Sequence, residues 1–276
     1  MTRSGLPVAS VAVLLIVVVA AICVPWLSPY EYFSPDWDNL NGAPRLLDGH
    51  LLGTDYIGRD LLVRLMWGCR ISLLVAFLAS LTSLSIGVLW GVTAGYLGGR
   101  LDAWMMRTVD VLYSVPFIPF VIVLTVIFGR EVLLLFIAIG AVSWLDIARI
   151  VRGQTLSLRQ REYIEAARVG GMTSAQIIRR HLIPNLIGIV LAYLTLTIPT
   201  VILIEAFLSF LGLGAQAPLT SLGVMIADGA SQMRSRPILL VYPAVLLAVI
   251  VYCCNRVGDA LRDRFDPTSG QGTGHD

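Results

Sequence analysis

Residues 161–185 read REYIEAARVGGMTSAQIIRRHLIPN, a polar stretch between two long apolar runs. Within it, Glu165-Ala166-Ala167 favours helix and Gly170-Gly171 breaks it. Ser174 is placed to cap a second helix, and Pro184 is expected to close the segment. The stretch therefore predicts a helix, a turn and a second helix on the cytoplasmic side of the flanking apolar runs.

This stretch resembles the Glu-Ala-Ala loop of the membrane subunits of bacterial ABC importers, because Gly171 follows Glu165 by six residues. Its ending, RHLIPN at 180–185, resembles the peptide and nickel branch of that family. The resemblance implies a mechanical loop that docks into a cleft of an ATPase subunit, whereas an ordinary amphipathic loop helix is the alternative. The implied coupling residues are Glu165, Ala166, Ala167, Gly171, Ile177, Arg180, His181 and Pro184.

The composition of the 276-residue chain is that of a multi-spanning membrane protein, with 57% hydrophobic residues, 14% charged residues and a mean hydropathy of +0.80. A helix of about 20 apolar residues crosses roughly 30 Å of hydrocarbon. The sequence predicts an all-α, polytopic fold with six transmembrane helices, and the resemblance implies the architecture of a type I ABC importer permease. The expected spans are Leu6–Leu27, Ile71–Tyr96, Val109–Phe128, Val132–Ile150, Ile183–Phe207 and Ile238–Cys254.

The basic residues, 20 in number and all arginine, orient the chain in the membrane. With the amino terminus inside, thirteen arginines fall on cytoplasmic segments and seven outside, which favours two cytoplasmic termini. The first apolar run, Val8–Val24, is longer than the core of a secretory signal, so we expect an uncleaved span. The resemblance implies a bacterial plasma (inner) membrane.

Three other motifs extend the resemblance. Residues 50–60, HLLGTDYIGRD, are similar to the start of the transport domain in dipeptide, oligopeptide and nickel permeases, although a turn and an interfacial amphipathic helix also fit them. Residues 205–214, EAFLSFLGLG, resemble the run that leads to the outer mouth in peptide permeases, and 258–267, GDALRDRFDP, match the closing motif. Leu222 stands where the family pattern predicts tryptophan. The expected organisation is an amino-terminal helix and external loop (1–49), a permease domain (50–267) and a disordered cytoplasmic tail (268–276).

Small residues and prolines predict two features of the spans. Gly87, Gly91 and Gly95 recur every four residues, so they clear one helix face for close packing. Pro116 and Pro119 interrupt the third span, which predicts a kinked or broken helix that either lines the pathway or merely bends for packing.

Glu205 is an acidic residue within an apolar run, and Ser209 follows it by one helical turn. An ionised glutamate at mid-membrane costs about 3 kcal/mol, so we expect Glu205 to face protein or water, or to be neutral. Pro116, Pro119, Glu205 and Ser209 are the candidate pathway or gate residues.

Several classes of site are excluded. The histidines His50, His181 and His275 are scattered, so no metal site is expected, and the four cysteines lack a zinc-binding spacing. The chain has no lysine and hence no Gly-Lys-Ser/Thr phosphate loop. A net charge of +2 gives no reason to expect nucleic-acid binding. We expect no enzymatic activity and no cofactor in this chain, with ATP and magnesium bound on partner subunits.

The resemblance implies a permease subunit that forms half of the pathway for peptides or a related small solute. The implied partners are a second homologous permease, two ATP-binding subunits and an extracytoplasmic substrate-binding protein, all meeting in membrane lipid. Nickel- or haem-specific importers share these motifs. The alternatives from other classes are a proton-coupled secondary transporter that uses Asp110, Asp146 or Glu205 as a relay, and a purely structural membrane subunit.

Overall fold

The computed structural model describes residues 7–45, 50–129 and 132–265, which form a helical bundle. The predicted all-α architecture is confirmed, and the expected tail at 268–276 lies outside the described residues. The helices are α1 (Val8–Leu27), α2 (Leu61–Leu97), α3 (Gly99–Tyr113), α4 (Phe117–Phe128), α5 (Val132–Arg159), α6 (Glu162–Val169), α7 (Ser174–Ile177), the π-helical turn η1 (Ile178–Leu182), α8 (Ile183–Phe210), α9 (Leu222–Ser231) and α10 (Ile238–Phe265).

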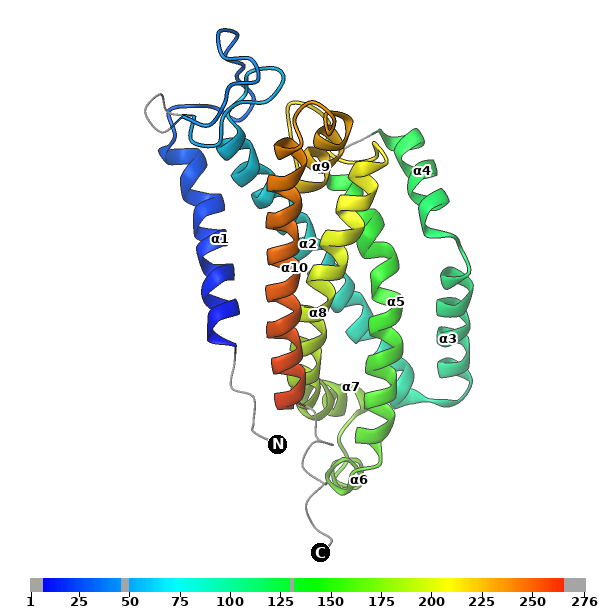
Figure 1. Cartoon of the computed structure of the whole chain (residues 1–276). Helices are drawn as coiled ribbons and strands as arrows, with labels where there is room; N and C mark the ends of the chain where they lie inside the picture. Colours follow the sequence, from blue (N-terminus) through cyan, green and yellow to red (C-terminus); the bar gives the residue numbers. More distant parts are fainter. Residues whose placement is uncertain (1–6, 46–49, 130–131, 266–276) are drawn as a thin grey trace, which may run out of the picture.

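The long helices α1, α2, α5, α8 and α10 run alongside one another, while α6 and α7 lie at one end of the bundle and α9 at the other (Figure 1). We call these the inner and the outer end, respectively. The start of α1 and the finish of α10 both lie at the inner end (Figure 1). The loop at 161–185 and both ends of the described chain are therefore on one side.

Among the described residues, four helical stretches are long and apolar enough to span a membrane, and a fifth is added when the bent pair α3–α4 is counted as one span. The four stretches are Val8–Leu27, Leu61–Leu97, Ser174–Phe210 and Ile238–Arg264. Helix α5 has 28 residues and runs through the bundle between the two ends. If α5 is counted as well, the number of membrane crossings is six. The expected number of six transmembrane helices stays a prediction.

Helix α2 starts ten residues before the expected span, at Leu61 instead of Ile71. Asp60 is its N-cap, and the Asp60 carboxylate accepts a 2.8 Å hydrogen bond from the Val63 N–H. The first turn is buried, including Arg64. The stretch expected to lead into the second span is therefore part of α2, because a good cap and buried apolar residues continue the helix outward, and the interfacial position of its first turns stays a prediction.

The third span is broken, as its prolines predict, and the halves α3 and α4 are bent by 77° relative to each other. Pro116 is the N-cap of α4, where its missing N–H costs nothing. Gly98 alone separates α2 from α3, so the chain reverses direction within one residue at the inner end. Gly98 has a φ of +67°, a conformation that lets one residue reverse the chain.

The glycines of α2 lie against α5 at very short range. A Cβ atom on Gly91 would lie 2.5 Å from the carbonyl oxygen of Ala148, and one on Gly87 would lie 2.7 Å from the Cβ atom of Ile147. Gly95 meets Thr155 in the same way. The backbones of α2 and α5 therefore approach as closely as small residues allow.

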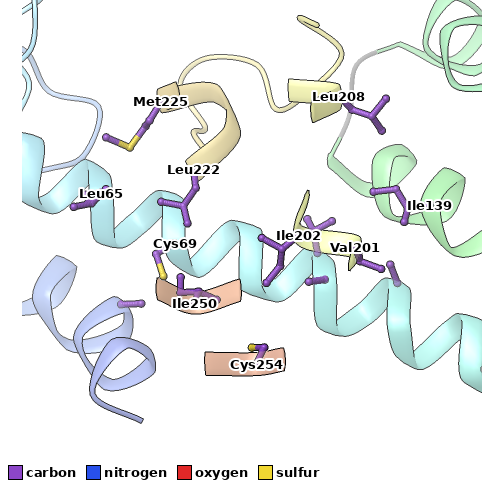
Figure 2. Packing of buried hydrophobic residues seen from close by; sticks show 14 of the residues in the cluster. Leu65, Cys69, Ile139, Val201, Ile202, Leu208, Leu222, Met225, Ile250 and Cys254 are labelled. Atoms are coloured by element: carbon purple, nitrogen blue, oxygen red, sulfur yellow. The ribbon is translucent and has the colours of Figure 1, made fainter. Parts of the chain in front are cut away.

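The outer half of the bundle is held by a core of apolar side chains from α2, α8, α9 and α10. Figure 2 shows Leu222 at the start of α9, close to Cys69 of α2 and Ile250 of α10. Leu222 is 0% exposed. The position where tryptophan was expected is therefore a fully enclosed core position, which leucine fills.

Candidate functional site

The inner loop is a helix, a turn and a second helix. Helix α6 has Glu162 and Glu165 in its first turn, where carboxylates interact favourably with the positive end of the helix dipole. Gly171 follows with a φ of +81°, the left-handed conformation that glycine adopts without strain. The expectation that Ser174 caps the second helix is wrong, because Thr173 is its N-cap.

Thr173 forms a capping box with Gln176. The Thr173 hydroxyl accepts a 3.3 Å hydrogen bond from the Gln176 N–H, and the Thr173 N–H donates to Gln176 Oε1 at 2.8 Å. The sequence contains the matching Thr-x-x-Gln pattern, so this cap could have been read from it.

The second loop helix does not end at Pro184. Helix α7, the turn η1 and α8 follow one another without a break, and Pro184 is the second residue of α8. The wider turn η1 lets the Ile183 N–H bond the Ile178 carbonyl, and this local widening directly before Pro184 accommodates the proline inside a continuous helix. The expectation that Pro184 closes the segment is therefore wrong, and the loop continues directly into a span.

Buried apolar residues anchor the loop. Ile164, Ile177 and Leu182 are 0% exposed and pack with Val92 and Tyr96 of α2. Ile177 is therefore a buried residue that holds the loop against α2. The outward-facing coupling candidates are Glu165, Ala166, Gly171, Arg180 and Pro184, which are exposed, with Ala167 and His181 half-buried.

Two exposed apolar residues of the loop were missed by the sequence reasoning. Val169 is 90% exposed and Tyr163 is 41% exposed, both on α6 beside the Glu-Ala-Ala triplet. Exposed apolar side chains beside this triplet are available for contact with another subunit. Because only one face of α6 is buried, apolar residues that fall outside that face could have been recognised from the sequence as exposed.

Glu205 and Ser209 lie in a closed polar network at the outer end. Glu205 is 1% exposed and accepts hydrogen bonds from the hydroxyls of Ser72 (2.9 Å) and Ser209 (2.7 Å). The Ser72 oxygen in turn accepts the Leu222 N–H at 3.1 Å, and the Ser209 and Ser221 oxygens are 3.3 Å apart. The network ties α2, α8 and α9 together inside this chain, so Glu205 faces protein.

The other pathway candidates are at the bend between α3 and α4, where Pro116 and Pro119 are exposed. Of the three carboxylates named for a proton relay, Asp110 pairs with Arg149 at 2.8 Å, Glu205 is in the serine network and Asp146 is exposed. Within the described residues, no hydrogen bond joins any two of these carboxylates.

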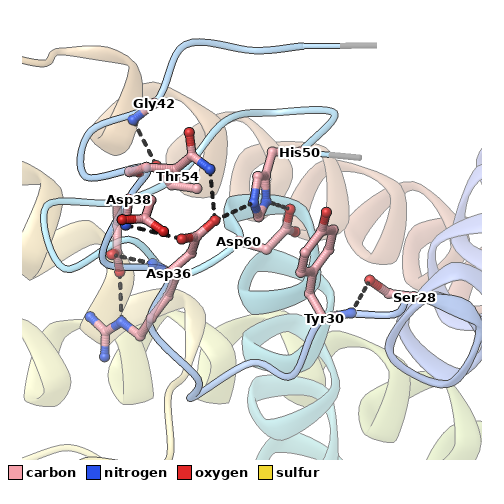
Figure 3. Close-up of polar contacts among 11 residues, drawn as sticks. Ser28, Tyr30, Asp36, Asp38, Gly42, His50, Thr54 and Asp60 are labelled. Carbon is pink, nitrogen blue, oxygen red and sulfur yellow. Dashed lines mark hydrogen bonds and ion pairs between the residues drawn. The ribbon is translucent and has the colours of Figure 1, made fainter. Parts of the chain in front are cut away.

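The outer segment at 28–45 and 50–60, which we call the outer cap, folds onto the start of α2. His50 Nδ1 lies 2.8 Å from the Asp60 carboxylate and His50 Nε2 lies 3.5 Å from that of Asp36 (Figure 3). The ring of Tyr30 stacks on His50 with centroids 4.1 Å apart. Hydrogen bonds from the Asn39 side chain and the Asp38 backbone hold the pKa of Asp36 below its ordinary value.

Ion pairs of the buried Arg64 join this cap to the half-buried Asp228 of α9. Arg59 Nε donates to the Asp55 carboxylate at 2.7 Å, and Arg64 lies 3.6 Å from Asp55 and 3.7 Å from Asp228 of α9. Burial raises the pKa of Asp228. Across the described parts of the chain, no three His, Cys, Asp or Glu side chains are grouped to hold a metal ion.

Comparison with known proteins agrees with these features. Residues 87–270 match the family described as binding-protein-dependent transport system inner membrane component, and residues 2–44 match the N-terminal TM domain of oligopeptide transport permease C. The oligopeptide transport system permease protein OppC of Haemophilus influenzae is 48% identical over 96% of this chain and 85% of its own. The OppC protein of Escherichia coli K12 is 51% identical over 94% of this chain and 86% of its own.

A more distant relative is the dipeptide transport system permease protein DppC of Bacillus subtilis, 40% identical over 96% of this chain and 82% of its own. Among solved structures, the inward-facing MetNI methionine ABC transporter superposes with a TM-score of 0.58 and 24% identity, over 73% of this chain and 96% of that chain. That likeness concerns the fold alone. The chain belongs to the family of binding-protein-dependent transport system inner membrane components, and it is a multi-pass, non-catalytic permease subunit of an ABC transporter with partner subunits.

Proposed function

We propose that this chain forms half of the translocation pathway of an ATP-driven oligopeptide importer and is coupled to an ATPase through the loop at 161–185. The observation that carries the proposal is the geometry of this loop. It presents Glu165, Ala166 and Val169 to solvent while Ile164 and Ile177 fix it to the bundle.

The loop is connected to the bundle in a way that suits a lever. Helix α6 starts three residues after α5 ends, and α7 continues through η1 into α8. A push on α6 or α7 is therefore passed to two helices that cross the bundle, because packed helices shift as rigid elements.

Oligopeptides are the proposed substrate because residues 2–44 match the N-terminal domain of oligopeptide transport permease C and because the relatives of 48% and 51% identity are named for oligopeptide transport. The dipeptide, nickel and haem alternatives of the same family are separated by ligand identification on the associated binding protein.

The proposed assembly contains a second, similar permease, two ATP-binding subunits and an extracytoplasmic substrate-binding protein. The proposed orientation places the inner end, with both termini and the loop, in the cytoplasm. The thirteen arginines on segments assigned to that side support this orientation.

The test is uptake by the assembled transporter in membrane vesicles carrying Gly171→Leu, alone and with Glu165→Ala. Gly99→Leu is a matched control, because both glycines have a positive φ, lie near the inner end and have no atom within 4 Å of an added Cβ. We expect uptake to fall roughly tenfold for Gly171→Leu, about 1.4 kcal/mol of coupling free energy, and much less for Gly99→Leu.

Equal uptake and equal transport-coupled ATP hydrolysis in the Gly171→Leu variant and the control would overturn the coupling role. Uptake that persists without ATP and stops when the proton gradient is dissipated would instead establish the secondary transporter.

A further inference from the structure

The inner half of α5 carries a row of exposed, largely polar positions. Asp146, Arg149, Gly153, Ser157 and Gln160 are all exposed. Their spacings of three or four residues place them on one face of the helix. We call this set the α5 stripe.

The opposite face of the same helix is buried. Ile147, Ala148, Val151 and Thr155 alternate with the stripe and pack against the glycine face of α2. The α5 stripe therefore points away from the packed interior of this chain.

Contact between the α5 stripe and lipid would be energetically unfavourable because the stripe carries charged side chains. Asp146 lies inside the apolar run Val132–Ile150 and, among the described residues, has no hydrogen bond or ion pair. A charged side chain exposed to hydrocarbon costs about 3 kcal/mol, so such residues face protein or a water-filled cavity. Arg149 is neutralised, since it pairs with Asp110 at 2.8 Å and lies 4.5 Å from the ring centre of Tyr113.

A groove continues the stripe toward α8. It has a volume of about 550 Å³ and lies between the inner ends of α5 and α8. Its lining combines polar groups with apolar ones: Gln154, Ser157, Asn185 and the cationic Arg161, together with Leu158, Pro184, Ile187, Gly188, Ile189 and Leu191. By contrast, the exposed surface of α4 is apolar, with Val123 54% exposed and Val126 79% exposed.

We propose that the α5 stripe and this groove line the water-filled inner half of the translocation pathway, with Asp146 as the carboxylate that passing solute meets. An unpaired carboxylate suits a solute that carries an ammonium group, as an unmodified peptide does at its amino terminus. The proposal rests on the proposed function for the existence of a pathway, but the labelling that tests it requires neither ATP nor a peptide, which only the added uptake measurement needs.

The test is the reaction of introduced cysteines with a membrane-impermeant, charged methanethiosulfonate reagent on the assembled transporter in inverted vesicles. The variants are Gly153→Cys and Ser157→Cys, with Val123→Cys and Val126→Cys as exposed apolar controls, all in a chain whose four native cysteines are replaced by alanine. Gly153 accepts the change because no atom lies within 4 Å of an added Cβ.

We expect the stripe cysteines to react at least about tenfold faster than the α4 controls, because only thiols in water form the reactive thiolate. Labelled Ser157→Cys should also lose uptake. Stripe cysteines that are as unreactive as the controls, whether covered by the second permease or by lipid, would overturn the proposal, and so would full labelling that leaves uptake unchanged.

The role of Asp146 is tested by reagent charge. Ile150 lies one turn from Asp146, so Ile150→Cys should react about threefold or more faster with a cationic reagent than with an anionic one, after correction for their reactivity toward a free thiol. Asp146→Asn should remove this preference. A preference that survives the change would exclude Asp146 as its source. If these reactions behave as expected but the loop variants transport normally, the pathway assignment stands and the coupling role fails.

Discussion

At the outer end of the bundle, charged and polar side chains are buried and bonded to one another, whereas at the inner end those of the loop are exposed. His50, Asp60 and Arg64 are each 6% exposed or less, and Glu205 is enclosed by serines. Glu165 and Arg180 are exposed and, within the described residues, form no ion pair. The difference shows that the outer end forms more of its polar contacts within this chain than the inner loop does, although the buried Arg64 Nη1 and Trp67 Nε1 have no hydrogen-bond partner among the described residues.

The largest expected effect comes from two glycines with the same backbone conformation at opposite ends. Gly58 has a φ of +89° and an added Cβ would overlap the Asp36 carbonyl, whereas Gly171 has a φ of +81° and open space. Gly58→Ala should destabilise the fold by about 3 kcal/mol, and Gly171→Ala by about 1 kcal/mol from backbone strain alone.

Thermal unfolding of the purified complex in detergent measures this pair of substitutions. Equal shifts in the unfolding temperature of Gly58→Ala and Gly171→Ala would contradict the proposed difference between the two ends. They would show that the outer cap is no more tightly packed than the inner loop.

The second effect concerns Glu205. Glu205→Ala should cost about 3 kcal/mol, since it removes the acceptor of two buried hydroxyls and leaves a cavity, while Glu205→Gln should cost about 1 kcal/mol. Unfolding of both variants checks the ranking. If Glu205→Ala kept full stability but abolished uptake, the carboxylate would serve the pathway, as the sequence suggested, instead of joining α2, α8 and α9.

The smallest effect is the pH dependence of the outer cap. The pKa of Asp36 is lowered, chiefly by the Asn39 side chain, so its ionised form stabilises the cap above the unfolded pKa. That contribution is lost as the pH falls through the folded value, below about pH 4. Hydrogen-exchange protection at 36–42 should therefore decrease in acid relative to α6, and Asp36→Asn should remove most of this decrease. The same decrease in Asp36→Asn would assign the pH effect to another group.

Local patterns predicted the bundle and the loop because both depend on sequence neighbours. Apolar length located the helices, Gly170-Gly171 located the turn, and Pro116 located the break between α3 and α4. Glycine spacing in α2 indicated a close contact, although the sequence did not identify α5 as the partner.

The error at the start of α2 occurred where distant residues decide the outcome, whereas those at Ser174 and Pro184 arose from neighbours within the loop. The second span was expected to begin at Ile71, but α2 begins at Leu61, and Asp55 and Asp228 from other segments let Arg64 be buried within it. Pro184 was expected to end a helix, and the wider turn before it keeps the helix continuous. The enclosure of Glu205 likewise depends on Ser72 and Ser221, far away in the sequence.

The most direct test of the central claim is a photo-crosslink from the inner loop. A photoreactive amino acid at Val169, which is 90% exposed, should crosslink to the ATP-binding subunit in the assembled transporter, while the same probe at Val126 of α4, 79% exposed, should not. A Val169 probe that crosslinks only to the extracytoplasmic binding protein, or never to an ATP-binding subunit, would contradict the account.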